Sequence, residues 1–342
     1  MRSLILETPK NPSSLKLVDQ ELPQPSSKQV RIKMTSMGLN RGDLLYCQGR
    51  YFFQATENSR LGFEGAGIID ALGSKVENSE FKPGDRVALL PMRFDIRHQG
   101  CFSEYGVYET SSLIHSPQNV PDDETGSLWM AFLTAWGGMI ECGSLSKGET
   151  VVITAASSSV GLAAIQIAKM LGAKVIATSS HESKSEALIE IGADKVIVLP
   201  SKLENEALAQ GIEHYVNNVK DFTREKGSDL VFDAVAGPAS HGLLKASAQG
   251  GRIVIQGMLD RRPMDIHAGV LMKRRLSLRG YTLDETLEND HKKRRAIEAI
   301  SNGFNNKQLK SIIAEKHALS SFDKAFEQLK QNRHIGKIVL IP

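Results

Sequence analysis

The chain has 342 residues, of which 41% are hydrophobic and 24% are charged, and its formal net charge is +3. This length accommodates two domains, and the composition is that of an ordinary soluble globular protein. The small net charge gives no reason to expect binding to nucleic acid or to a membrane surface. No apolar run is long enough to span a bilayer, and the first residues lack the apolar segment of a signal peptide.

The cysteines restrict the classes of site that the chain can build. Cys47, Cys101 and Cys142 are widely spaced and odd in number. They provide neither a disulfide framework nor a four-cysteine zinc site. The sequence therefore predicts a protein of the reducing cytoplasm.

The first part of the chain, to about residue 125, consists of short β-like runs separated by turn residues. Glycine and proline punctuate these runs, as is typical of antiparallel strands and their turns. The pattern predicts a barrel-like β-domain. The runs are Val30 to Met34, Gly65 to Ile69, Arg86 to Leu90 and Tyr105 to Tyr108.

The stretch from Thr150 to Ser180 has the pattern strand, tight turn, helix, strand. Val151 to Ile153 form an apolar run typical of a strand that is buried on both faces. Apolar residues then recur at helical spacing from Val160 to Leu171, and Gly172 stands where a C-cap glycine is expected. A second apolar run, Val175 to Ala177, completes a βαβ unit. The first turn of such a unit is where dinucleotide phosphates meet a helix N-terminus.

The turn of this unit departs from the usual glycine fingerprint, because Ala156, Ser158 and Gly161 occupy the three positions of G-x-G-x-x-G. Small residues still let backbone N–H groups approach a pyrophosphate, and Gly161 lets the helix pack closely on the strand. A serine-rich turn of any α/β domain explains the turn alone equally well. Its place between a strand and a helix favours phosphate binding, by Ser158, Ser159, Val160 and Gly161.

Beyond this unit, strand-like runs alternate with helical patterns, which is typical of a doubly wound parallel sheet. Helical patterns continue after about residue 284, and the last strand is Lys337 to Ile341. We predict a first domain of residues 1–125 that is completed by 284–342, and a second domain of residues 126–283. The alternating runs are Lys195 to Leu199, Leu230 to Val235, Arg252 to Gln256 and Leu276 to Thr282.

Short motifs stand in order over essentially the whole chain: GLNRGDLLYCQGRY at 38–51, LGFEGAGII at 61–69, FKPGDRV at 81–87, GCFSEY at 100–105, AASSSVGLAAIQIAK at 155–169 and HIGKIVL at 334–340. Together they resemble the zinc-independent quinone oxidoreductase branch of the medium-chain dehydrogenase/reductase superfamily. The resemblance implies a GroES-like β-barrel catalytic domain, a Rossmann domain and an active-site cleft between them.

The positions of the zinc ligands carry different residues in this chain. In zinc-dependent relatives these positions hold a cysteine and a histidine, whereas here they are Asn40 and Phe63. Neither an amide nor a phenyl ring replaces thiolate and imidazole, and the cysteine cluster of the structural zinc is missing as well. The resemblance therefore implies hydride transfer without zinc to a small quinone or α,β-unsaturated carbonyl, in which conjugation spreads the developing negative charge.

Asn40 matches the family position whose side chain lies near the nicotinamide and the substrate, where a hydrogen-bond donor stabilises an oxyanion. Without the resemblance, a turn residue after a strand is the simpler interpretation. Tyr46 and Tyr51 are candidate proton donors, with packing as core tyrosines as the alternative. Asp43 is expected to cap a helix or to form an ion pair rather than to act in catalysis.

The residues at the end of the second strand of the βαβ unit determine whether NAD or NADP is preferred. An NAD enzyme places an acid there for the ribose 2′-OH, but here no acid occurs before Glu182. Lys184 matches the family lysine that pairs with a 2′-phosphate, and Ser179 and Ser180 offer further donors. A solvated lysine at the start of a helix is the alternative, but the missing acid favours NADPH. Further cofactor contacts are expected at Leu199, Ala236, Gly257, Met258 and Lys337.

Two other classes of function stay open. The chain could bind NADPH but act as a structural or RNA-binding protein, although no basic stripe with interleaved aromatic residues supports this. It could also be a trans-acting enoyl reductase that serves a carrier-bound thioester. Finally, Leu276 to Thr282 resembles the sheet edge through which relatives pair, so a homodimer is expected.

Overall fold

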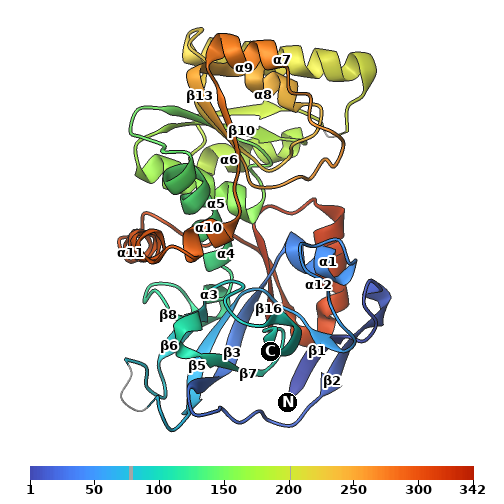
Figure 1. Ribbon diagram of the computed structural model, residues 1–342, viewed down its shortest axis with the longest axis vertical. Coiled ribbons are helices and arrows are strands. Elements are labelled where there is room, and N and C mark those ends of the chain that lie inside the picture. The colour runs from blue at the N-terminus through green and yellow to red at the C-terminus, as the bar shows by residue number, and fades with distance from the viewer. Residues whose placement is uncertain (77–79, 201) are drawn as a thin grey trace. The chain divides into compact units, whose positions relative to one another are not determined.

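The computed structural model describes residues 1–76, 80–200 and 202–342. The chain forms two compact units, Met1–Met130 with Lys310–Pro342, and Ala131–Leu309 (Figure 1). The predicted return at residue 284 differs from this division, because the segment up to Leu309 packs within the second unit. The rings of Phe132 and Phe304, for example, have centroids 4.9 Å apart.

The described residues of the first unit form two β-sheets. Its strands are β1 (Arg2–Leu6), β2 (Leu15–Asp19), β3 (Gln29–Leu39), β4 (Ser59–Arg60), β5 (Gly65–Leu72), β6 (Arg86–Leu89), β7 (Tyr105–Glu109), β8 (Leu113–His115), β15 (Ile313–Ala318) and β16 (Lys337–Ile341). Among the described residues, one sheet has three strands in the order β2-β1-β4. The other has seven, in the order β15-β16-β3-β5-β6-β8 with β7 paired to β3. This confirms the predicted β-rich, GroES-like domain.

The core of the first unit is built on β3, which pairs with β5, β7 and β16. Its alternate residues Val30, Ile32 and Met34 are buried, as the period of a strand with one face on a core requires. The helices of this unit are α1 (Arg41–Cys47), α2 (Ile96–Gln99), α3 (Asp122–Thr125) and α12 (Phe322–Gln331), and α4 (Trp129–Trp136) begins at its end.

The second unit is a Rossmann domain, as predicted. Its strands are β9 (Thr150–Ile153), β10 (Lys174–Ser179), β11 (Lys195–Val198), β12 (Ser228–Asp233), β13 (Ser247–Ile255) and β14 (Ser277–Gly280). Within the described part of the chain they form one parallel sheet in the order β11-β10-β9-β12-β13-β14. The order reverses between β9 and β12, and ligands of doubly wound sheets bind at the carboxyl ends of the strands around such a point.

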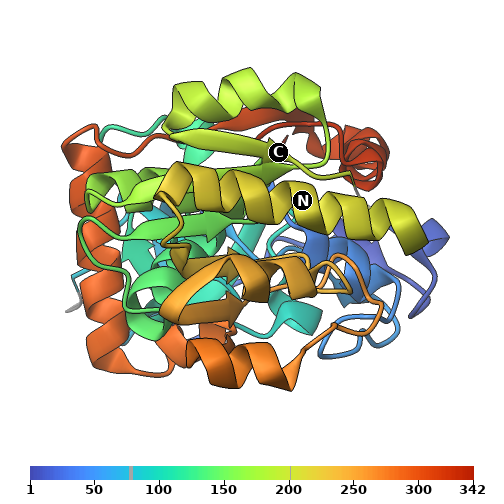
Figure 2. The same cartoon turned by 90° about the horizontal axis from the view of Figure 1, so that it is seen from above.

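Helices lie on both sides of this sheet (Figure 2). They are α5 (Ser159–Met170), α6 (Ser185–Ile191), α7 (Asn205–Thr223), α8 (Ser240–Ala246), α9 (Ala268–Arg274), α10 (Leu283–Leu287) and α11 (Asp290–Asn305), and a π-helical segment, Gly137–Cys142, follows α4. Val151, Val152 and Ile153 are wholly buried because both faces of β9 are covered. None of the helices in the described ranges combines the length and apolar character that a bilayer span needs.

Candidate functional site

The predicted phosphate turn joins β9 to α5. Ser158 is the N-cap of α5, and its Oγ accepts a hydrogen bond from the Gly161 N–H at 3.1 Å. A Cβ atom on Gly161 would lie 2.6 Å from the backbone of Ala156, so only glycine allows this approach of helix and strand. The N-terminal N–H groups of this 12-residue helix, which include those of Ser159 and Val160, suit a pyrophosphate.

Lys184 lies beside this turn. Its Nζ donates to Ser157 Oγ at 3.2 Å, and its side chain is buried. Burial lowers the pKa of Lys184, because it disfavours the charged form. Ser179 makes local hydrogen bonds with the backbone of His181, whereas Ser180 is half-buried. A cation next to a helix N-terminus provides the charge that an anionic dinucleotide needs.

Asp233, which was not predicted as a site residue, orders the carboxyl end of β12. Its buried carboxylate accepts hydrogen bonds from Thr154 Oγ1 at 2.6 Å, from Val235 N at 2.9 Å and from Ala236 N at 3.0 Å. These bonds hold Ala236 in the left-handed region, with φ at 58°. Burial raises the pKa of Asp233, and the three hydrogen bonds oppose this rise. The other predicted strand-end residues, Leu199, Gly257 and Met258, follow β11 and β13.

A polar cluster around Glu64 lies in the first unit. Lys337 Nζ donates to Asn40 Oδ1 at 2.6 Å and to Glu64 Oε1. Asn40 Nδ2 donates to Glu64 Oε1 and to Gly38 O, both at 3.1 Å. Glu64 Oε2 accepts the Met130 N–H at 2.9 Å. Lys337 is 3% exposed and Glu64 is 1% exposed, whereas Asn40 is half-buried at their side; we call Asn40, Glu64 and Lys337 the buried cluster.

Strand pairing explains why residues so far apart in sequence meet. Leu39, the last residue of β3, pairs with Ile338 of β16, which places Asn40 near Lys337. Glu64 directly precedes β5, which pairs with the other side of β3. In the sequence, the one signal for Glu64 is that it is a carboxylate inside the apolar run LGFEGAGII.

Asp43 completes this region from the first turn of α1. Its Oδ2 accepts the Asn40 N–H at 2.8 Å, which is the capping role expected from the sequence. Burial raises the pKa of Asp43 to about 7, although the Asn40 N–H and the charge of Lys337 oppose the rise. Its Oδ1 has no hydrogen-bond partner among the described residues. A buried carboxyl group with one oxygen that lacks a hydrogen bond favours the protonated form.

The two candidate tyrosines lie in different surroundings. Tyr46 is wholly buried, and its ring lies 5.5 Å from that of Phe53 and 6.0 Å from that of Phe63. Tyr51 is partly exposed, and its hydroxyl donates to Met92 Sδ at 3.2 Å. This burial favours a packing role for Tyr46 and leaves Tyr51 as the more accessible phenol. Phe63, at the position of the zinc-binding histidine, is part of this aromatic core.

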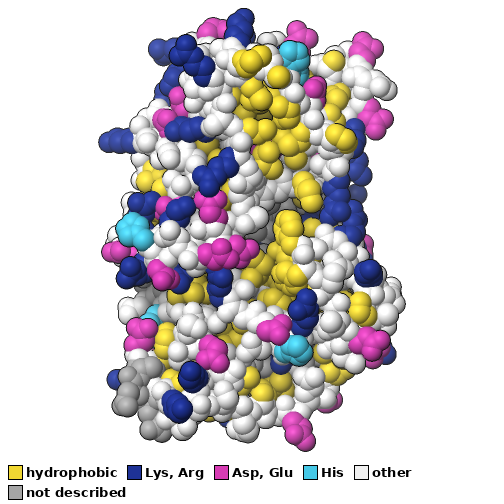
Figure 3. Space-filling view, viewed as in Figure 1, with side chains coloured by type: hydrophobic (Ala, Val, Ile, Leu, Met, Phe, Trp, Pro, Cys, Tyr) yellow, Lys and Arg dark blue, Asp and Glu magenta, His cyan; other side chains and the backbone are white. Residues whose placement is uncertain are grey.

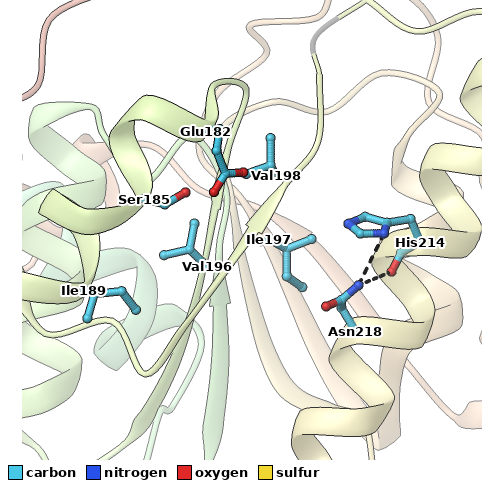
Figure 4. Close-up of a pocket in the computed structure, with 8 residues that line it drawn as sticks. All are labelled: Glu182, Ser185, Ile189, Val196, Ile197, Val198, His214 and Asn218. Atoms are coloured by element: carbon cyan, nitrogen blue, oxygen red, sulfur yellow. Dashed lines mark hydrogen bonds between the residues drawn. The ribbon is translucent and has the colours of Figure 1, made fainter.

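A depression of about 370 Å³ lies against the edge strand β11 (Figure 4). On the α7 side of it, the Asn218 side chain is held by the backbone, because its Nδ2 donates to the His214 carbonyl oxygen at 2.9 Å. None of the predicted cofactor residues lines it, so we do not include it in the candidate site. The lining residues are Glu182, Ser185, Ile189, Val196, Ile197, Val198, His214 and Asn218.

In the part of the chain that the structure describes, no group of three or more His, Cys, Asp and Glu residues could hold a metal ion.

Comparisons with known families and proteins agree with this architecture. Residues 26–118 match the alcohol dehydrogenase GroES-like domain, and residues 159–302 match the zinc-binding dehydrogenase family. The mitochondrial enoyl-[acyl-carrier-protein] reductase of Dictyostelium discoideum is 29% identical over 92% of this chain and 87% of its own length. The quinone oxidoreductase of Lama guanicoe is 26% identical over 100% of this chain and 97% of its own length.

A second kind of relative is much longer. The reducing polyketide synthase FUB1 of Gibberella fujikuroi is 29% identical over 94% of this chain, which spans only 13% of that protein. Among solved structures, an NAD-dependent alcohol dehydrogenase matches with a TM-score of 0.84 at 28% identity, covering 100% of both chains. A quinone oxidoreductase of Pseudomonas syringae pv. Tomato matches with a TM-score of 0.83 at 27% identity, covering 100% of this chain and 99% of its own.

Proposed function

Because this chain belongs to the zinc-independent quinone oxidoreductase-like branch of the medium-chain dehydrogenase/reductase superfamily, we propose that it reduces quinones or α,β-unsaturated carbonyls with NADPH. The matched families and the Rossmann unit support an oxidoreductase of this superfamily that uses a nicotinamide cofactor. A bound reduced nicotinamide supplies hydride. The chain's own residues have to bind that cofactor, select NADPH over NADH and stabilise the charge that develops on the acceptor.

The position of Lys184 supports NADPH. Its ammonium is at 3.2 Å from Ser157 Oγ in the phosphate turn, and Thr178 to Ser180 offer hydroxyls where an NAD enzyme has an acid. One solved relative is an NAD-dependent alcohol dehydrogenase, so relatives alone do not decide between the cofactors. The residues of this chain favour the one with a 2′-phosphate, because an ammonium pairs with it.

Replacing Lys184 by alanine is expected to weaken NADPH binding and to leave NADH binding nearly unchanged. A charge-assisted contact contributes about 1.5–3 kcal/mol, which corresponds to a tenfold or larger rise in the Kd for NADPH. Titration of each cofactor, followed by nicotinamide fluorescence, measures both constants. Lys174→Ala is the matched control, because Lys174 is exposed at the opposite end of β10. Equal weakening of both cofactors would mean that Lys184 supports the fold instead.

Developing negative charge on a conjugated acceptor requires a nearby cation or hydrogen-bond donor. In this proposal the buried cluster and the Tyr51 hydroxyl provide that part of the site, with Asn40 assigned to it by the family resemblance. No zinc takes part, because Asn40 and Phe63 replace its ligands.

An acceptor panel tests the proposed function. The wild-type protein is assayed for NADPH and NADH oxidation with 1,4-benzoquinone, a simple enone and an aldehyde, and its metal content is measured in parallel. Turnover of the conjugated acceptors by a metal-free preparation supports the proposal. Reduction of the aldehyde alone, or a stoichiometric metal that survives chelation, contradicts it.

Relatives favour one second candidate, an enoyl reductase that acts on a carrier-bound thioester. The enoyl-[acyl-carrier-protein] reductase and the polyketide synthase both match almost the whole of this chain. An enoyl thioester is itself a conjugated carbonyl, so the same charge-stabilising groups would serve it. Crotonyl coenzyme A added to the acceptor panel separates the two candidates, because a dedicated enoyl reductase prefers it to benzoquinone in kcat/KM.

We extend the proposal to a homodimer that pairs through β14. This strand is at the edge of the parallel sheet and is largely exposed, and no residue of the preceding helix α9 is buried. Hydrophobic side chains gather on the surface near α8 and α9 in Figure 3, and Met272 of α9 is 75% exposed. An open edge and an apolar helix are features that a second copy covers. A monomer in light scattering at assay concentration would contradict this assembly.

A further inference from the structure

The hydrogen bonds of Asn40 determine what its amide can offer to a ligand. A primary amide has two N–H donors and one acceptor oxygen. An ammonium only donates, so the atom that faces Lys337 Nζ at 2.6 Å is Oδ1. Nδ2 then faces Glu64 Oε1 and Gly38 O, both acceptors, at 3.1 Å. The chemistry of the neighbours therefore fixes the orientation of the amide without ambiguity.

Both N–H donors of Asn40 are used inside the protein. One goes to the Glu64 carboxylate and the other to the Gly38 carbonyl. No N–H remains for the oxygen of a substrate, although a donor at this position is what the family resemblance suggested. The group of the buried cluster that carries positive charge is the Lys337 ammonium.

Glu64 accepts at both of its oxygens. Oε1 takes Asn40 Nδ2 and Lys337 Nζ, and Oε2 takes the Met130 N–H. A glutamine has only one acceptor oxygen, so its amide nitrogen would face a donor on one side. A carboxylate is therefore required at position 64, and its charge also balances the buried ammonium.

The backbone next to the cluster leaves no spare room. A Cβ atom on Gly38 would lie 2.7 Å from Glu64 Oε1, 2.7 Å from Lys337 Cε and 2.9 Å from Gly126 O. The absence of a side chain at position 38 thus lets the ammonium stem and the carboxylate pack directly against β3. Lys337 is therefore held by Asn40 and Glu64 at its ammonium and lies against Gly38 along its stem.

We infer that Asn40 and Glu64 are positioning residues that hold the Lys337 ammonium, and that Asn40 itself donates no hydrogen bond to the substrate. This inference rests on the proposed function for its catalytic meaning, but the hydrogen bonds can be tested in the ligand-free protein. Removing any member of the buried cluster should then act through Lys337.

The first experiment is hydrogen exchange of side-chain amides in ligand-free protein labelled with [¹⁵N]asparagine. The Asn40 signal is the one that disappears in Asn40→Asp. Both of its Nδ2 hydrogens are expected to exchange at least about tenfold more slowly than those of Asn58, which is exposed. Exchange as fast as that of Asn58 would overturn the inference, whatever the protein turns out to reduce.

The second experiment uses Glu64→Gln, with Glu57→Gln as an exposed control in the same unit. Glu64→Gln is expected to speed exchange at Asn40 and to lower kcat by about tenfold or more, with a smaller effect on the KM of the acceptor. Unchanged exchange and unchanged kcat would overturn the assignment of Glu64. If Glu64→Gln does not fold, the wild-type exchange still decides the state of Asn40. Absence of turnover in the wild type would reject the proposed function and leave the exchange result intact.

Discussion

Turnover of a conjugated acceptor is expected to fall on the order of a hundredfold when Asn40 is replaced by alanine. The amide oxygen of Asn40 holds the Lys337 ammonium at 2.6 Å, and alanine leaves that cation with Glu64 as its hydrogen-bond acceptor in the buried cluster. A charged group that is no longer held in place loses its effect on the transition state, because stabilisation of developing charge depends on preorganisation. Steady-state kcat and KM with 1,4-benzoquinone and with an enone measure the loss, and an aldehyde is the control substrate.

A double-mutant cycle shows whether the cluster acts as one unit. If Asn40 works through Lys337, then Lys337→Met should cost about as much as Asn40→Ala, and the double variant should cost little more than either. Asn58→Ala, at an exposed asparagine of the same unit, should leave the rate unchanged. Full activity of Asn40→Ala on conjugated acceptors would remove Asn40 from the site. Additive losses would mean that Asn40 and Lys337 contribute separately.

The free energy of unfolding is expected to fall as the pH rises from about 4 to about 7, because of Asp43. Its pKa in the folded protein is raised from 3.8 to about 7, so the folded state keeps a proton that the unfolded state has released. Stability from this group is fully present below the unfolded pKa and is lost as the pH rises through the folded one. The whole effect amounts to about 4 kcal/mol, since one pKa unit corresponds to 1.36 kcal/mol.

Asp43→Asn should remove most of this dependence. Asparagine keeps an oxygen for the Asn40 N–H, which Asp43 Oδ2 accepts at 2.8 Å, but it carries no charge at any pH. Urea unfolding between pH 4 and pH 8 measures the free energy of unfolding of the variant and of the wild type. The contributions of other titrating groups, such as Asp233, cancel in the difference between the two. The free energy of unfolding of the variant should increase relative to that of the wild type as the pH rises. Asp19→Asn is the exposed control, and a difference for Asp43→Asn that is constant with pH would contradict the raised pKa.

Local sequence patterns were sufficient to predict the Rossmann unit. The apolar run at Val151 to Ile153, the helical spacing that follows and Gly172 are found as β9, α5 and the left-handed residue after it. These signals are readable because a buried parallel strand and an amphipathic helix each impose a period on a short segment. The serine-rich turn was also placed correctly, at the N-terminus of α5.

The pairing of strands that are far apart in the chain could not be predicted from the sequence. Glu64 and Lys337 meet because β5 and β16 flank β3, and no local pattern states which strands are neighbours. The burial of Tyr46 could not be predicted either, since an aromatic side chain after a strand is equally typical of a hydrophobic core and of a binding site. The helices after residue 284 show an apolar face, but its partner within the second unit depends on the tertiary fold.

The packing of Phe63 bears on how such a protein can change over evolutionary time. Its ring is 1% exposed and lies 5.0 Å from that of Tyr51 and 5.8 Å from that of Phe53. A histidine here would bury polar ring nitrogens among aromatic side chains, at a cost of about 1–3 kcal/mol when they find no partner. The other position that holds a zinc ligand in zinc-dependent relatives is Asn40 here, and it is hydrogen-bonded to Lys337 and Glu64. Building a zinc site at these two positions one substitution at a time would therefore pass through less stable intermediates, whichever position changed first.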